Sequence, residues 1–129
     1  MIKFDEAESN ILATLEEAGE DGIAALLNTV NAAHAHGSAE EIDTFRVALT
    51  NLINRGLLEI ANVRDAESKR WTPLPKSEAL SVLRKLGSFL GWSRTEELWT
   101  WSSPAPRAEV LLTTAGAVAA REVLTERGC

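Results

Sequence analysis

The feature that most constrains this chain is an abrupt change of periodicity at Gly56. Before it, apolar residues recur every three or four positions and predict an amphipathic helix. After it, residues 57–61 follow at once and are typical of a strand. Glycine favours the left-handed conformation that ends many helices, so Gly56 marks the boundary. We expect the helix to lie beneath two earlier helices, with a β-hairpin alongside. Its buried stripe should be Ile42, Phe45, Ala48, Leu49, Leu52 and Ile53.

Other elements are expected around this unit. Ser38 and Glu41 match a capping box, which starts the helix at 38, and Asp43 offers a later start. Thr113 or Thr114 should cap the last helix. Apolar stripes predict further helices over 5–18, 22–33, 77–90 (closed by Gly91) and 115–126. Strands are expected at 57–61, 70–72, 98–102 and 109–113.

Two stretches of the chain resemble the winged helix-turn-helix superfamily. Residues 45–60, Phe-Arg-Val-Ala-Leu-Thr-Asn-Leu-Ile-Asn-Arg-Gly-Leu-Leu-Glu-Ile, are similar to a third helix that ends in an apolar pair and Arg-Gly before a strand. Residues 112–116, Leu-Thr-Thr-Ala-Gly, resemble the strand-to-helix step that closes such domains. The resemblance implies a mainly α fold with a small antiparallel sheet. We expect one winged helix-turn-helix domain over residues 1–129, with an extra helix and a C-terminal helix, similar to bacterial winged-helix proteins of unknown role.

The position of the wing hairpin has two alternatives. In the first, residues 57–74 form it, and 77–90 is an appended helix. In the second, residues 98–113 form it, and 77–90 is an insertion. We favour the second alternative slightly because its strands are longer.

The resemblance also implies a surface for double-stranded DNA. In this superfamily the third helix enters the major groove. Residues opposite its apolar stripe would then face base edges, where Asn side chains donate and accept hydrogen bonds. Cations in the following turn would contact phosphates. The candidate residues are Arg46, Thr50, Asn51, Asn54 and Arg55 on the helix, and Arg64, Lys69 and Arg70 in the turn.

The charge distribution favours a different partner. The net charge is −6, and residues 1–43 hold one lysine and ten acidic residues. An acidic chain repels nucleic acid, although residues 44–94 carry nine cations and four acids. The alternative to a DNA-binding regulator is therefore a winged helix that serves protein association or homodimerisation. Trp99 and Trp101 share one strand face, and we expect either core packing or a partner contact there.

Several classes of function are disfavoured. No apolar run approaches the roughly 20 residues of a membrane span. The single cysteine, Cys129, forms no internal disulfide, so a reducing cytoplasm is expected. His34 and His36 do not share a helix face, and we interpret them as a solvated turn and not a metal site. Glycine-rich phosphate loops and nucleophile elbows do not occur. We expect no enzymatic activity and no cofactor.

Overall fold

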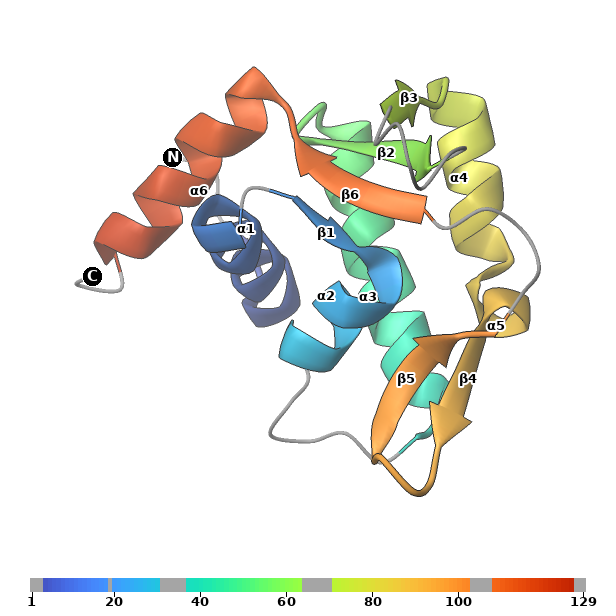
Figure 1. Ribbon diagram of the computed structural model, residues 1–129. Helices are drawn as coiled ribbons and strands as arrows, with labels where there is room; N and C mark the ends of the chain where they lie inside the picture. The colour runs from blue at the N-terminus through green and yellow to red at the C-terminus, as the bar shows by residue number, and fades with distance from the viewer. Residues whose placement is uncertain (1–3, 19, 31–36, 64–70, 103–107, 127–129) are drawn as a thin grey trace.

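The computed structural model describes residues 4–18, 20–30, 37–63, 71–102 and 108–126. These residues form a mainly α structure with a small antiparallel sheet, as the sequence predicts (Figure 1). The elements follow one another along the chain as α1 (Glu6–Ala18), β1 (Glu20–Gly22), α2 (Ile23–Val30), α3 (Ala39–Asn54), β2 (Leu58–Val63), β3 (Trp71–Pro73), α4 (Lys76–Arg84), α5 (Leu86–Phe89), β4 (Leu90–Ser93), β5 (Leu98–Trp101), β6 (Ala108–Leu112) and α6 (Thr114–Glu126).

Four strands form an antiparallel sheet in the order β1-β6-β2-β3. Its central pair, β2 and β6, runs from Leu58 opposite Leu112 to Asn62 opposite Ala108. On β2, Leu58 and Ile60 are buried on one face, whereas on the other face Glu59 is exposed and Ala61 is buried. One face of the sheet therefore packs on the core, and the other is only partly open to solvent.

Helices surround the buried face of this sheet (Figure 1). α1 packs against α2, α3 and α6, and α4 packs against α3 and β2. All six residues of the predicted α3 stripe are buried, which confirms that prediction. They join the buried residues of α1, α2, the sheet and α6 in a single hydrophobic cluster. Burial of this apolar surface is the main favourable contribution to folding.

The favoured position of the hairpin, residues 98–113, is wrong. β5 does not pair with β6: Leu98 lies opposite Ser93 of β4, in a separate two-stranded sheet. β6 instead pairs with β1 and β2. The physical reason is side-chain packing, because β4 and β5 bring two indole rings into edge contact while Val110 of β6 is fully buried in the core. The first alternative is confirmed as a strand pair, since β2 and β3 are antiparallel neighbours.

The predicted helix over 77–90 is wrong at its C-terminal end. α4 stops at Arg84, the four-residue α5 follows after Lys85, and β4 begins at Leu90. Gly91 therefore lies within a strand and does not close a helix. Leu83 and Leu86 on either side of the break are both buried. The helix ends early because residues 90–93 pair with β5, where the rings of Trp92 and Trp99 are in contact.

Two glycines hold the junction between α3, β2 and α6. Gly56 has a φ of 74°, and its N–H donates to Ile53 O while the Leu57 N–H donates to Leu52 O. This is the Schellman arrangement of a helix end, as the sequence predicts. A Cβ atom on Gly116, in the first turn of α6, would lie only 1.9 Å from Leu57 O. The two chain segments can meet this closely only because position 116 has no side chain.

Thr113 completes the junction. Its hydroxyl accepts a hydrogen bond from the Gly116 N–H at 3.0 Å and donates one to Gly56 O at 2.7 Å. Thr113 is therefore the cap of α6, in agreement with the first of the two predicted caps. Its backbone N–H also donates to Leu57 O at 3.0 Å, which extends the pairing of β2 with β6. Residues 112–116 thus connect the start of α6 to the end of α3.

Within the described ranges, no helix has both the length and the apolar character that crossing a bilayer requires.

Candidate functional site

Helix α3 presents an open polar face. Asn51 and Asn54 are exposed on it, and Thr50 is half-buried. Val47 lies among them with 56% of its surface exposed, an unusual position for a large apolar side chain. The sequence reasoning placed these residues opposite the apolar stripe, and the structure puts them on that side of α3.

The first cation of this face is paired within the helix. The Arg46 guanidinium contacts the Asp43 carboxylate one turn earlier in α3. Such an exposed pair contributes little to stability, roughly 0.2–1 kcal/mol. Its effect on the surface is larger, because the acid cancels the positive charge at the point where phosphate would have to bind.

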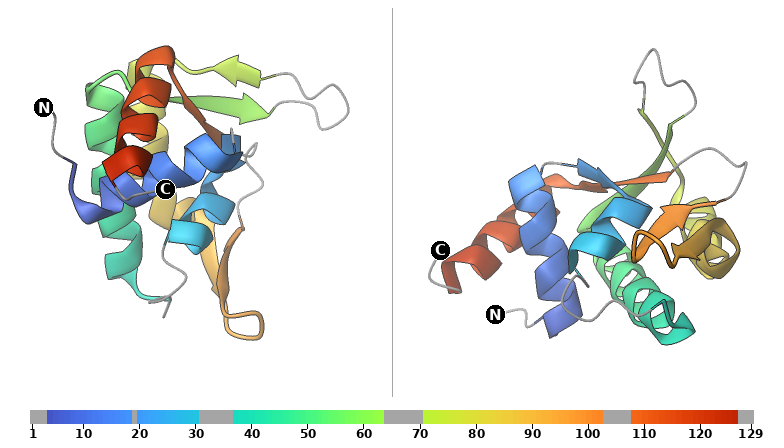
Figure 2. Two further views of the ribbon diagram at one scale, coloured as in Figure 1. Left: turned by 90° about the vertical axis from the view of Figure 1, so that its left-hand side faces the viewer. Right: turned by 60° about the horizontal axis from the view of Figure 1, so that its bottom comes forward.

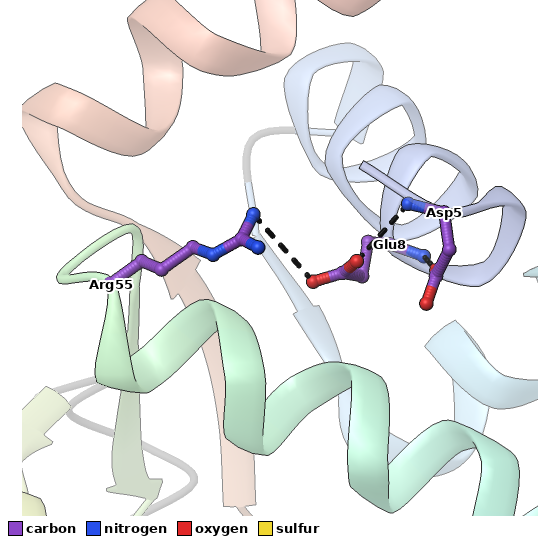
Figure 3. A network of polar contacts seen from close by, with 3 residues as sticks. All are labelled: Asp5, Glu8 and Arg55. Atoms are coloured by element: carbon purple, nitrogen blue, oxygen red, sulfur yellow. Dashed lines mark hydrogen bonds and ion pairs between the residues drawn. The ribbon is translucent and has the colours of Figure 1, made fainter. Parts of the chain in front are cut away.

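The second cation turns away from the α3 face. Arg55 follows the last turn of α3 and reaches across to the start of α1, where its Nη1 lies 3.9 Å from Glu8 Oε2 (Figure 3). The guanidinium carbon also lies 5.3 Å from the centre of the Phe4 ring, within the range of a cation–π contact. In this arrangement Arg55 holds α1 to the end of α3 and does not project outward beside Asn51 and Asn54.

Glu8 explains why Arg55 adopts this position. Glu8 and Asp5 form a reciprocal capping box, in which the Asp5 N–H donates to Glu8 Oε1 at 3.1 Å and the Glu8 N–H donates to Asp5 Oδ1 at 2.8 Å (Figure 3). Glu8 is only 4% exposed, and its Oε2 atom has no hydrogen-bond partner within the described residues. A buried carboxylate is costly without a compensating charge, and Arg55 supplies that charge.

The β2–β3 hairpin points away from the outer face of α3. Both views of Figure 2 show these strands extending from the end of α3 to the opposite side of the molecule. As far as they are described, β2 and β3 extend away from α3 and do not run alongside it (Figure 2). Arg64, Lys69 and Arg70, predicted to contact phosphates, lie outside the described residues.

The two tryptophans predicted to share a face differ in exposure. Trp99 is 5% exposed and belongs to the core, which is the first of the two expectations. Its indole Nε1 donates to Glu41 Oε2 at 2.9 Å, and its ring meets Trp92 edge-on with centroids 5.3 Å apart. Trp101 is half-buried, with its ring centre 5.1 Å from that of Phe89.

Asn28 of α2 fastens β5 to the helices. Its Nδ2 donates to Trp99 O at 2.8 Å, and its Oδ1 accepts from the Trp99 N–H at 2.7 Å. The amide thereby satisfies both backbone groups of one strand residue, as a neighbouring strand would. Sequence reasoning missed this residue, because an Asn in a helix carries no sign that a strand 71 positions away will dock on it.

Glu41 departs from the capping box predicted with Ser38. Ser38 is the N-cap of α3, but its side chain makes no capping hydrogen bond. Glu41 Oε2 accepts instead from the Gly37 N–H at 3.3 Å as well as from Trp99. The predicted start of the helix is therefore confirmed, and the predicted side-chain bonding is wrong because the indole of Trp99 engages the carboxylate.

A groove opens between α1, α2 and the N-terminal half of α3. Its volume is about 480 Å³, within the roughly 300–1,000 Å³ range of ligand pockets. Buried apolar side chains form its floor, and three glutamates stand at its rim with no Lys or Arg among the described lining residues. We call this the acidic groove; it is lined by Glu6, Ala7, Asn10, Ile11, Leu27, Val30, Ser38, Glu40, Glu41, Thr44 and Phe45.

The acidic groove was not foreseen as a site, although part of its signal was in the sequence. The excess of acids over residues 1–43 is visible in the chain. What the sequence did not reveal is that the first turns of α1 and α3 converge, so that Glu6, Glu40 and Glu41 border one hollow. Acids in a first turn are ordinarily explained by the helix dipole alone.

Neither a cluster of metal-ligating residues nor a comparison with known proteins identifies a further site. Across the part of the chain that the structure describes, no group of three or more His, Cys, Asp or Glu side chains is placed to hold a metal ion. His34, His36 and Cys129 are outside that part. No family model, curated protein or solved structure matches this chain.

Proposed function

We propose that this protein is a non-catalytic interaction module that binds another protein through its acidic helical surface. The observation that supports the proposal is the pairing of the cations at the α3 face: Arg46 contacts Asp43, and Arg55 contacts Glu8. Contacts between cations and phosphate supply much of the affinity of DNA-binding proteins. With these arginines engaged by carboxylates of the same chain, the α3 face offers little attraction to a polyanion.

The direction of the β2–β3 hairpin supports the same proposal. A winged helix that reads DNA uses its third helix together with neighbouring elements that contact the same duplex. Here the described strands of the hairpin extend away from the α3 face (Figure 2). The elements follow the order α1, β1, α2, α3, β2, β3, and a resemblance to winged helices would not by itself specify DNA binding, because fold alone does not specify function.

Site-specific photo-crosslinking in cells that express the whole chain tests this proposal. A photoreactive residue replaces Glu40 at the acidic groove, and the matched control replaces Glu122 on α6; both positions are exposed. We expect a discrete protein adduct from position 40 and none of that size from position 122. Adducts to nucleic acid, or identical adducts from both positions, would overturn the proposal.

DNA binding by α3 is the second candidate. It is favoured by the exposure of Asn51 and Asn54, and by exposed Arg84 and Lys85 at the end of α4, the helix that packs beside α3. Gel retardation of a duplex at low salt separates the two candidates. If the protein is a protein-binding module, no retarded complex should form at protein concentrations up to about 10 µM. This concentration lies within the range of dissociation constants, about 1–100 µM at physiological salt, that is typical of non-specific DNA binding. A complex that is lost in Asn51→Ala/Asn54→Ala and kept in Glu122→Gln would establish the second.

A further inference from the structure

We infer that the acidic groove is the docking site for a basic amphipathic segment of the partner protein, a helix with apolar residues on one face and lysines or arginines beside them. The inference rests on the proposed function, because it identifies which surface binds the partner and what chemistry the partner carries. The occupant is another protein and not a second copy of this chain.

The apolar floor of the groove favours a partner segment with an apolar face. Ile11, Leu27 and Phe45 are at most 3% exposed and form its base, with half-buried Ala7 and Val30 beside them. Because Ile11, Leu27 and Phe45 are already covered, the apolar surface left for a partner to cover is that of half-buried Ala7 and Val30. Covering such surface gains about 25 cal/mol per Å². Helices of a partner commonly insert one apolar stripe into a groove of this kind.

The acidic rim of the groove favours a partner segment that carries positive charge. Glu6 and Glu40 are exposed at the edge of the hollow, and Glu41 is half-buried between α3 and β5. They are not grouped as metal ligands within the described residues, so a divalent ion is not the expected occupant. Lysines or arginines flanking an apolar stripe complement such a rim, and the −9 balance of residues 1–43 adds long-range attraction for a basic segment.

Glu41 is held in place before any partner arrives. Its Oε2 atom accepts from the Trp99 indole and from the Gly37 N–H, which orients the carboxylate at the groove. Replacing Glu41 would therefore disturb the packing of β5 as well as the groove. Glu6 and Glu40 are the residues to change, because they are exposed and lie in the first turns of α1 and α3.

Binding of a designed probe tests the inference. The probe is a fluorescent helical peptide of about 18 residues with leucines at helical spacing and lysines on the other faces, and its counterpart carries glutamates in place of the lysines. Fluorescence anisotropy measures its affinity for the full chain, for Glu6→Gln/Glu40→Gln, and for the matched control Glu122→Gln/Glu126→Gln. The control loses the same two charges from exposed positions of α6, away from the groove.

We expect the lysine peptide to bind and the glutamate peptide not to bind. The groove variant should bind the lysine peptide about fivefold more weakly at low salt, and the α6 variant should stay within about twofold of the unmodified chain. The fivefold difference should shrink as salt rises toward about 0.5 M, because exposed ion pairs are screened. Circular dichroism of both variants checks that the helices are intact.

Three results would overturn the inference. The first is equal weakening by the two variants, which would mean attraction by net charge alone. The second is equal binding of both peptides or no binding of the lysine peptide. The third is a dimer of the chain by light scattering that Glu6→Gln/Glu40→Gln dissociates, since the groove would then hold a second copy. Each of these leaves the crosslinking and DNA experiments to decide the proposed function separately.

Discussion

The close packing of Gly116 on Leu57 gives the most demanding prediction, Gly116→Ala. A Cβ atom at position 116 would lie 1.9 Å from Leu57 O and 2.9 Å from Leu57 C, whereas ordinary contact begins at 3.4 Å. The first turn of α6 would have to retreat by about 1.5 Å, and Leu57 O is already fixed by the Thr113 N–H at 3.0 Å. Backbone atoms cannot give way as the end of a flexible side chain can.

The expected cost follows from two opposing effects. Overpacking against fixed backbone costs roughly 3 kcal/mol, at the upper end of measured cases. Alanine in place of glycine in a helix returns up to about 1 kcal/mol. We therefore expect Gly116→Ala to lower the free energy of unfolding by about 2 kcal/mol, or the melting temperature by about 8 °C for a chain of this length.

Gly87→Ala is the matched control. Gly87 lies in the short helix α5, and a Cβ atom there would meet nothing within 4 Å. The same substitution should therefore leave stability unchanged or raise it by up to about 1 kcal/mol. Urea unfolding followed by circular dichroism measures both variants. If Gly116→Ala proves as stable as Gly87→Ala, α6 does not pack closely on the α3–β2 turn, and the reasoning is refuted.

Two further substitutions test the polar contacts that hold the elements together. Asn28→Ala removes both hydrogen bonds to the Trp99 backbone and should lower the free energy of urea unfolding by about 2 kcal/mol. The control Asn51→Ala, at an exposed position, should change it by less than about 0.5 kcal/mol. Similar values for the two variants would contradict the docking of β5 on α2. Glu8→Ala removes the capping box of α1 and should cost about 1–2 kcal/mol, and Glu8→Gln should cost less because its amide oxygen still accepts from the Asp5 N–H. Thermal unfolding of both Glu8 variants decides this, and a larger loss for Glu8→Gln would refute the capping argument.

Much of the fold follows from local patterns in the chain. The apolar stripe over residues 42–53, the left-handed Gly56 and the Thr113 cap each depend on contacts within a few residues, so their sequence signals were sufficient. The capping box of Asp5 and Glu8 is equally local. Its acid-x-x-Glu signature is present in the sequence at Asp5 and Glu8.

Strand pairing was decided by tertiary packing. β1 consists of Glu20, Asp21 and Gly22, residue types with low strand propensity, and it exists because β6 lies beside it. β5 pairs with β4, and Trp92 and Trp99 pack together across this pair. The residue pattern along one strand does not specify which other strand it pairs with.

The candidate sites divide in the same way. The sequence by itself determined which α3 residues face outward, because helical periodicity orients side chains. Only the tertiary structure decided that Arg55 turns to Glu8, and that Glu6, Glu40 and Glu41 border one groove. Both depend on distances between elements far apart in the chain, which are set by how the core packs and not by any local preference.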